Sequence, residues 1–253
     1  MRGPTGPFAQ PDLPSPVPPH PADSLLTPER AHKYRQVLAR RSKRLVIVVE
    51  DCTDPHNATA IVRTCDAFGL SRVIVTTSKN TFKINPKVSQ GSHYYMDVEV
   101  FPEITAAYAK LRAEGYRILV TDLAADAVVG PDALKPLLAE QPLALVFGNE
   151  SDGVSRAASE QADGCFLIPM VGFPQSLNLS VSVATTVYTL CGERLAANAP
   201  GDLSAAEQTA LYDKWLRRRK GELVDRVLAR DIDRNGAPIE VFSAPCAMPE
   251  MPR

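Results

Sequence analysis

Between Leu45 and about residue 197, short apolar runs alternate with amphipathic segments. Apolar runs of about four to eight residues predict strands, and apolar positions three and four residues apart predict helices. Strands that alternate with helices form a largely parallel sheet. We therefore predict an α/β fold, a mostly parallel sheet with helices on both faces. The predicted strands are 45–50, 72–77, 97–101, 116–121, 143–147 and 165–169, and the predicted helices are 57–68, 103–114, 131–139, 155–161 and 178–197.

The segments on either side of this core follow other patterns. Prolines crowd the first 21 residues, and such a composition forms neither a helix nor a sheet ladder. Thr27-Pro28-Glu29 provides an N-cap, a first-turn proline and an acid, which predicts a helix to about Arg41. Ser204-Ala-Ala-Glu207 is a capping box that predicts a last helix. The predicted segments are a disordered tail (1–25), a basic N-terminal helix (26–44), the α/β domain (45–199), a basic C-terminal helix (200–232) and an extended tail (233–253).

Charge separates the two flanking helices from the core. The chain of 253 residues has a net charge of −1, which as a whole argues neither for nor against nucleic acid. In the N-terminal helix, Arg35, Arg40 and Arg41 have only Glu29 as compensation, which favours contact with phosphates. The basic cluster 217–220 has acidic neighbours that weaken it. The alternative for both helices is a solvated basic face.

The cysteines and the apolar runs limit the class of protein. Five cysteines are scattered with no C-x-x-C pair, and no histidine stands at metal-ligand spacing. They predict reduced thiols and no metal site. The N-terminus has no apolar stretch of a signal peptide, and no run approaches the roughly 18–20 residues of a membrane span. We therefore expect a cytoplasmic protein. The cysteines are at positions 52, 65, 165, 191 and 246.

The first candidate segment follows the first predicted strand. The strand ends in two acids, a proline turn follows, and Asn57 stands at the position of a helix N-cap. Arg63 lies about two turns further along, from where it can reach the crevice in which open α/β sheets bind ligands. The alternative is that Asn57 only caps the helix and Arg63 points to solvent.

The second candidate segment is Phe147–Val154. A buried strand stops at Gly148, which allows a close approach of the backbone to a ligand. No Gly-Lys-Ser/Thr follows, and no G-x-G-x-x-G follows any predicted strand, so nucleoside triphosphate and dinucleotide loops are excluded. The alternative is a plain turn into a helix capped by Asp152 or Ser155.

The third candidate segment, residues 168–182, joins the last strand to a helix through a Gly/Pro loop. More small polar side chains open this helix than one cap requires, which is typical of a loop that grips a ligand. No G-x-S-x-G elbow or nearby histidine activates a serine, which excludes an acyl-transfer nucleophile. The chemistry must come from holding two substrates in position. These small polar residues are Ser176, Asn178, Ser180 and Ser182.

Taken in order, the three segments resemble the three motifs of the SPOUT RNA 2′-O-ribose methyltransferases, and the TrmH branch most. The resemblance covers roughly residues 30–197. It implies S-adenosylmethionine as methyl donor, held in a C-terminal trefoil-knotted region. The motifs read Asn57-x5-Arg63-Thr64, Phe147-Gly-Asn-Glu150-x2-Gly153 and Ile168-Pro-Met-x-Gly172-x3-Ser176-Leu177-Asn178-x-Ser180-Val181-Ser182. The implied donor-binding residues are Thr121, Phe147, Gly148, Asn149, Gly153, Ile168, Met170, Ser176 and Leu177.

The resemblance also implies the catalytic residues. In the family the equivalent of Arg63 activates the 2′-hydroxyl. Because arginine is effectively always protonated and binds phosphate bidentately, Arg63 either acts in that way or positions a phosphate. The residues that would orient Arg63, the hydroxyl and the loop are Asn57, Glu150, Ser176 and Asn178. The predicted RNA-binding residues are Arg35, Arg40, Arg41 and Arg63.

The resemblance finally implies a substrate and an assembly. The substrate is a ribose 2′-hydroxyl in RNA, and the flanking helices favour a guanosine of the tRNA D-loop over ribosomal RNA. A catalytically silent RNA-binding protein on the same fold is the alternative, but it would not need the candidate residues together. A homodimer is implied as well. Its interface would use Val181, Ala184, Val187 and Tyr188, which could equally be core of one chain.

Overall fold

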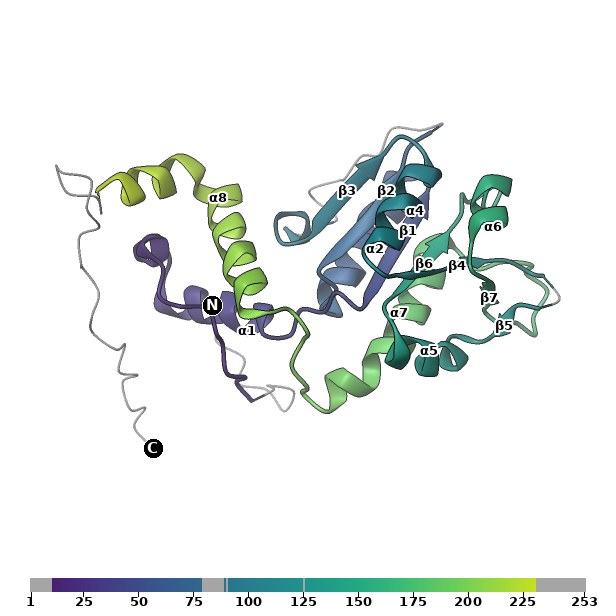
Figure 1. The fold of residues 1–253 in the computed structure, drawn as a ribbon, viewed down its shortest axis with the longest axis horizontal. Coiled ribbons are helices and arrows are strands. Elements are labelled where there is room, and N and C mark those ends of the chain that lie inside the picture. Colours follow the sequence, from purple (N-terminus) through teal and green to yellow (C-terminus); the bar gives the residue numbers. More distant parts are fainter. Residues whose placement is uncertain (1–10, 79–88, 90, 125, 231–253) are drawn as a thin grey trace. The chain divides into compact units, whose positions relative to one another are not determined.

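The chain forms two compact units, which the computed structural model describes over residues 11–78, 89, 91–124 and 126–230 (Figure 1). One unit contains residues 39–203 together with the segment up to Leu13. The other contains residues 14–38 together with the segment from Ser204. Residues 1–10 of the predicted N-terminal tail, the whole predicted C-terminal tail (233–253) and the last two residues of the predicted C-terminal helix (231–232) lie outside the described residues.

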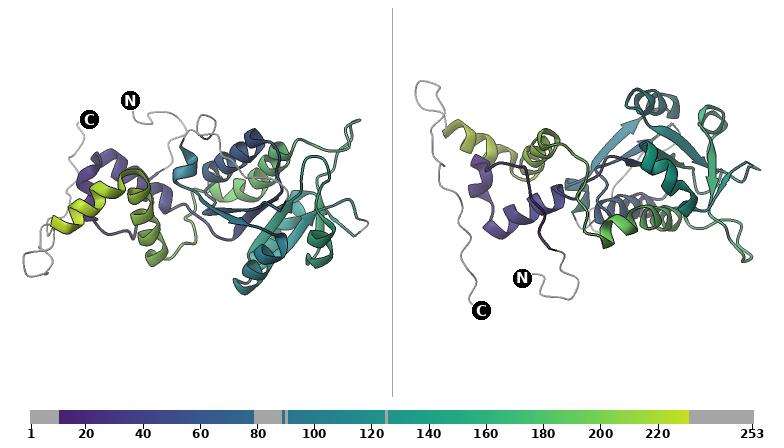
Figure 2. Two further views of the ribbon diagram at one scale, coloured as in Figure 1. Left: turned by 90° about the horizontal axis from the view of Figure 1, so that it is seen from above. Right: turned by 60° about the horizontal axis from the view of Figure 1, so that its bottom comes forward.

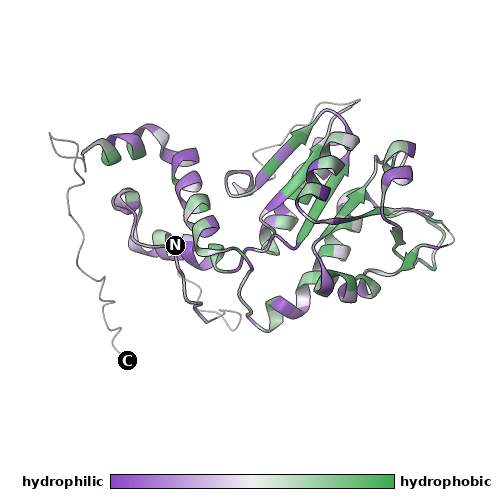
Figure 3. Cartoon of the chain, viewed as in Figure 1, coloured by the Kyte–Doolittle hydropathy of each residue, from purple (hydrophilic) through white to green (hydrophobic). Residues whose placement is uncertain are grey.

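A seven-stranded sheet forms the centre of the larger unit. Its strand order is β3-β2-β1-β6-β4-β7-β5, and every strand pair described in it is parallel. Figure 3 shows the strongly apolar colouring of the central strands, as expected where both faces are covered. The strands are β1 (Leu45–Glu50), β2 (Arg72–Thr76), β3 (Asp97–Phe101), β4 (Arg117–Thr121), β5 (Val128–Val129), β6 (Leu143–Phe147) and β7 (Cys165–Leu167).

Side chains of β1 alternate between two hydrophobic cores because successive residues of a strand point to opposite faces. Ile47 packs with α2 and α7 on one face, and Val48 packs with α4 and α6 on the other. Figure 2 shows these helix layers on the two sides of the sheet. The predicted parallel sheet with helices on both faces is confirmed. The helices are α2 (Pro55–Ala67), α4 (Ile104–Ala113), α5 (Lys135–Glu140), α6 (Arg156–Gln161) and α7 (Leu179–Ala196).

The start of α2 differs from the prediction. Asp54 is the N-cap, and its carboxylate accepts a hydrogen bond from the His56 backbone N–H at 2.8 Å. Proline suits the first position of a helix, so the cap falls on the residue before Pro55. Asn57 is therefore inside the first turn with a buried side chain, and its predicted capping role is wrong.

The two-residue strand β5 and the 3-10 helix η2 (Ser92–Tyr94) were not predicted, because they are too brief to show a period. A further 3-10 helix, η3 (Pro131–Leu134), precedes α5. The predicted helix 131–139 is thus a 3-10 turn followed by a short α-helix. No helix in the described part of the chain combines the length and apolar character needed to cross a bilayer.

The smaller unit joins the two flanking segments around an aromatic core. It contains η1 (Pro21–Leu25), α1 (Pro28–Leu38) and α8 (Ala205–Arg230), with a kink at Lys220. Tyr34 packs edge-on against Trp215, with ring centroids 5.7 Å apart. The capping box predicted at residues 204–207 is confirmed, since Glu207 and Ser204 bond each other in both directions.

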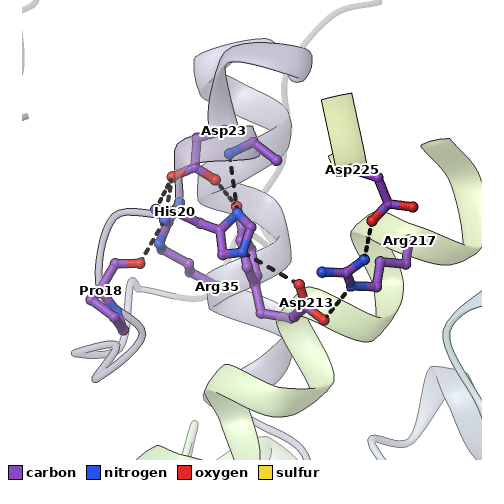
Figure 4. A network of polar contacts seen from close by, with 9 residues as sticks. Pro18, His20, Asp23, Arg35, Asp213, Arg217 and Asp225 are labelled. Carbon is purple, nitrogen blue, oxygen red and sulfur yellow. Dashed lines mark hydrogen bonds and ion pairs between the residues drawn. The ribbon is translucent and has the colours of Figure 1, made fainter. Parts of the chain in front are cut away.

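Residues 21–25, predicted to be disordered, are the 3-10 helix η1. His20 accepts a hydrogen bond from the Ala22 backbone N–H at 3.1 Å, and the Asp23 carboxylate accepts one from the His20 N–H at 3.0 Å. Asp23 also pairs with Arg35, as Figure 4 shows. Proline content correctly excluded an α-helix here. It did not reveal these polar contacts, which order the segment and tie it to α1.

Candidate active site

The three candidate segments meet at the carboxyl ends of the strands. β1 and β6 are neighbours in the sheet, so the loops that follow them start side by side. The loop after β7 and the first turn of α7 complete one wall of a pocket of about 770 Å3. This volume is within the range of about 300–1,000 Å3 that is usual for ligand and cofactor pockets. The position is also the one expected for ligands in an open parallel sheet.

All nine residues predicted to bind the methyl donor line this pocket. They come from the end of β4, the end of β6 and the loop after it, and the two sides of the loop that precedes α7. The nine are Thr121, Phe147, Gly148, Asn149, Gly153, Ile168, Met170, Ser176 and Leu177.

The loop after β6 is a tight turn that only glycine permits at its first position. A Cβ on Gly148 would be 2.0 Å from the carbonyl carbon of Gly153, and Gly153 itself has a φ of +70°. Asn149 and Gly153 exchange two backbone hydrogen bonds of 2.8 and 3.0 Å. The Asn149 side chain accepts from the Ser151 N–H and donates to the Asp51 carbonyl, both at 2.7 Å. The loop is thus closed on itself and tied to the end of β1.

A relay of hydrogen bonds links three of the predicted catalytic residues. The Asn178 Nδ2 donates to the Asn57 Oδ1 at 3.0 Å. The Asn57 Nδ2 donates in turn to the Glu150 Oε1 at 3.0 Å. The Asn178 Oδ1 caps α7 by accepting from the backbone N–H groups of Ser180 and Val181. The relay therefore connects all three candidate segments.

Glu150 is held as an anion. Burial on its own would raise the pKa of the Glu150 carboxyl, but hydrogen bonds from Asn57 and Thr53 lower it to about 2. Burial, and then Glu150 itself, raise the pKa of the neighbouring Cys52 thiol to about 12. Glu150 is ionised throughout the neutral range, so it is a fixed negative charge and an acceptor, and carries no proton.

The other two predicted catalytic residues lie apart from the relay. Ser176 has an exposed side chain on the pocket wall. Arg63 has an exposed side chain on α2 and is not among the residues that line the pocket. The structure therefore brings Asn57, Glu150 and Asn178 together, and the roles of Ser176 and Arg63 stay predictions.

The RNA-binding prediction is wrong for Arg41. Its side chain is 0% exposed and donates to the Leu70 carbonyl at 2.5 Å, while it forms an ion pair with Asp66. Arg35 pairs with Asp23 (Figure 4) and Arg40 donates to Asn198 at 2.9 Å, and both side chains are partly exposed. The sequence predicts that the arginines of the N-terminal segment lie on the surface and contact phosphates. Part of its charge instead neutralises the chain's own acids.

The predicted dimer face divides into core and surface. Val187 is 0% exposed and belongs to the core between α7 and the sheet, so of the two alternatives, interface or core, the structure gives the core for this residue. Val181 and Tyr188 are 46% and 64% exposed on the same helix. In the loop before α7, Val171 and Phe173 are fully exposed. The part of the chain that the structure describes leaves these four apolar side chains uncovered.

The pocket combines apolar and acidic side chains. Leu167, Ile168 and Leu177 offer apolar area, and the acidic residues Asp122, Glu150 and Asp152 are also among the lining residues. Such a pocket suits an organic ligand with a positive charge, because a carboxylate nearby favours a cation. Asp122 was not singled out in the sequence, where an acid after a strand is a common and uninformative feature.

Comparisons with known proteins identify similar chains. The model of the SpoU rRNA Methylase family matches residues 44–188. A tRNA (guanosine(18)-2′-O)-methyltransferase of Thermus thermophilus is 33% identical over 203 residues, which cover 80% of this chain and 95% of the relative. The crystal structure of the Aquifex aeolicus TrmH/SpoU tRNA modifying enzyme is 31% identical, with a TM-score of 0.68 over 76% of this chain and 97% of that one. The SpoU methyltransferase AviRb of Streptomyces viridochromogenes, in complex with AdoMet, shares the fold at 24% identity, with a TM-score of 0.52 over 63% of this chain and 64% of that one.

Proposed function

This chain belongs to the SpoU rRNA Methylase family, and we propose that it methylates the ribose 2′-hydroxyl of guanosine 18 in the D-loop of tRNA. The observation that carries the proposal is the pocket at the carboxyl edge of the sheet. All nine predicted donor-binding residues line this pocket. The hydrogen-bond relay from Asn178 through Asn57 to Glu150 includes two residues of the same lining, Asn178 and Glu150. The tRNA substrate is supported by the relative of Thermus thermophilus, of which the match covers 95%.

The cofactor is S-adenosylmethionine, which supplies an electrophilic methyl group on a positively charged sulfur. The pocket fits it in chemistry. The turn at Gly148 leaves no room for a side chain, so backbone groups form that wall. Ile168 and Leu177 provide apolar area for an adenosine group, and the ionised Glu150 favours the cationic end. We also propose the trefoil knot that the resemblance implies, with its loops around this same pocket.

Positioning is the main contribution that this chain makes to the reaction. Alignment of two bound reactants can supply about 7–11 kcal/mol of barrier lowering in favourable cases. The relay fixes the first turn of α2 against the first turn of α7, so the helix that carries Arg63 is held in register with the pocket wall. We propose that Arg63 binds a phosphate next to the target ribose, because its guanidinium donates and does not accept protons.

The smaller unit supports an RNA substrate through its charge. Residues 14–38 and 204–230 contain ten Lys and Arg against six Asp and Glu, a net charge of +4. Residues 39–203 contain 15 against 18, a net charge of −3. With Arg41 excluded, we propose that exposed basic side chains such as Lys33 and Arg218 contribute phosphate contacts. A cytoplasmic location, where tRNA is found, completes the proposal.

We also propose a homodimer in which the exposed apolar side chains of the larger unit face a second copy. Val181 is next to the pocket-lining Ser182 in the chain, and Phe173 lies in the loop between the pocket-lining Met170 and Gln175, so a partner on this face would lie close to the donor site. Tyr188 lies further along α7, where it packs against Phe68. Val181→Asp with Tyr188→Asp should give a monomer in analytical ultracentrifugation. A dimer that survives both changes would remove this face from the interface.

The substrate is tested by incubating the full-length protein with labelled S-adenosylmethionine and either a tRNA transcript or ribosomal RNA. Label in tRNA supports the proposal. Label in ribosomal RNA alone, the substrate in the name of the family, would replace tRNA with ribosomal RNA. No label in either, with the donor still bound, would indicate a silent RNA-binding protein.

A further inference from the structure

We propose that Thr53 is a positioning residue that fixes the orientation of the Glu150 carboxylate and, through it, of Asn57. This inference rests on the proposed function and adds to it a residue that the motifs do not contain. Thr53 lies in the loop between β1 and α2, immediately before the N-cap Asp54. It is the residue through which that loop contacts the second carboxylate oxygen.

The two oxygens of Glu150 have different partners. The Oε2 accepts from the Thr53 hydroxyl at 2.8 Å and from the Thr53 backbone N–H at 3.1 Å. The Oε1 accepts from the Asn57 Nδ2 at 3.0 Å, with the Cys52 thiol at 3.2 Å and the Asp54 N–H at 3.4 Å. Each of these partners is a donor, including the thiol, so the carboxylate is held only in its ionised form.

In the relay, each residue donates a hydrogen bond to the next, from Asn178 to Asn57 and from Asn57 to Glu150, and the groups at both ends fix this direction. The Asn178 Oδ1 is occupied by the N–H groups of α7, so the Asn178 side chain presents its Nδ2 to Asn57. Asn57 must then present Oδ1 to Asn178 and Nδ2 to Glu150. A reversed Asn57 amide would place two NH2 groups together and an oxygen against a carboxylate, losing both hydrogen bonds. The orientation of Asn57 therefore depends on a correctly placed acceptor at Glu150.

Thr53 fixes the rotation of the Glu150 carboxylate, which the Glu150 side chain does not fix by itself. The terminal torsion of a glutamate is broad and roughly two-fold, so its own rotamer preference does not decide where each oxygen lies. The two donors of Thr53 grip one oxygen and so place the other opposite Asn57. The Thr53 side chain is exposed, so its hydrogen bond contributes little to stability. Its hydroxyl matters for alignment between α2 and the pocket wall, which controls turnover.

The test compares Thr53→Val, which keeps the shape and removes the hydroxyl, with Thr53→Ser, which keeps the hydroxyl. Both variants are measured in the full-length protein for kcat and KM with tRNA and S-adenosylmethionine, and for melting temperature. The side-chain amide signals of Asn57 and Asn178 are recorded by 15N–1H NMR without substrate. They report the relay independently of activity.

Thr53→Val should lower kcat about 3- to 10-fold, leave the donor KM within about two-fold and shift the melting temperature by no more than about 2 °C. The Asn57 amide signals should shift in Thr53→Val and return to the wild-type position in Thr53→Ser, together with kcat. Wild-type kcat and unchanged Asn57 signals in Thr53→Val would overturn the inference. Equal impairment in both variants would also overturn it, because the hydroxyl would then be irrelevant. A wild-type protein that methylates no RNA would contradict the proposed function, while the NMR comparison would still decide the role of Thr53.

Discussion

Replacement of Arg41 by methionine distinguishes an internal arginine from an RNA contact. Methionine has a similar length and no charge, so it fills much of the same volume. It leaves the buried carbonyl of Leu70 without the donor that now lies at 2.5 Å, and it removes the ion-pair partner of Asp66. Lys43, two residues further on and exposed, provides the matched control as Lys43→Met.

The size of the effect follows from what each group loses. A buried carbonyl without a donor costs about 1–3 kcal/mol. The Asp66 side chain is 21% exposed, so water compensates part of the lost ion pair, and the total should be about 3 kcal/mol, near the lower end for broken buried pairs. For a unit of this size that corresponds to a fall in melting temperature of about 6–12 °C. Lys43→Met should change the unfolding free energy by no more than about 0.5 kcal/mol.

The assay is urea unfolding of both variants, with tRNA binding measured over a range of salt at a temperature where both are folded. Arg41→Met should lower the unfolding free energy and leave the salt dependence of binding unchanged. A loss of stability below about 1 kcal/mol, with a salt slope reduced by about 0.7–0.9, would mean that Arg41 contacts a phosphate. The assignment of Arg41 to the interior would then be refuted.

Three further changes test the site. Gly148→Ala should abolish binding of S-adenosylmethionine in calorimetry, because the added Cβ would be 2.0 Å from the Gly153 backbone. The control Ser151→Ala, at an exposed position in the same loop, should bind the donor normally. Full binding by Gly148→Ala would contradict the tight turn at this position. Arg63→Ala should abolish methyl transfer while donor binding survives, and an active variant would remove Arg63 from the mechanism. The pKa of Glu150 is about 2 in the folded protein and about 4.3 in the unfolded chain, so its ionised form stabilises the fold at every pH above about 4.3. This contribution should disappear as the pH falls from about 4.3 to about 2. Acid unfolding of Glu150→Gln should lack that part of the pH dependence, and an unchanged acid profile would show that Glu150 is not the group responsible.

The sheet could be predicted from the sequence because its strands are long enough to show a pattern. β6 and the first five residues of β1 are continuous apolar runs, and the predicted ranges 45–50 and 143–147 match the observed strands. β5 has two residues and no pattern to read. The first turn of α2 shows a different limit, because Asn57 and Asp54 are both good caps and only the position of Pro55 separates them.

Some residues of the site could be predicted from their neighbours in the sequence, and others could not because their role depends on residues far away in the chain. Gly148 and Asn178 could be found because their positions beside a strand end and a helix start have a local meaning. Thr53 and Cys52 carry no such signal, since their importance arises from Glu150, about a hundred residues away in the chain. Arg41 was misplaced for the same reason. The carboxylate of Asp66 at the end of α2 and the carbonyl of Leu70 just after that helix bind its guanidinium. A count of charges along residues 26–44 contains no information about either group.

The most direct test of the central claim is mass spectrometry of the nucleosides and fragments of a tRNA transcript after incubation with the protein and S-adenosylmethionine. The account predicts one 2′-O-methylguanosine, at position 18, and none in a matched transcript with 2′-deoxyguanosine at that position. A methyl group on a base, at another nucleotide, or still present in the deoxy transcript would contradict it.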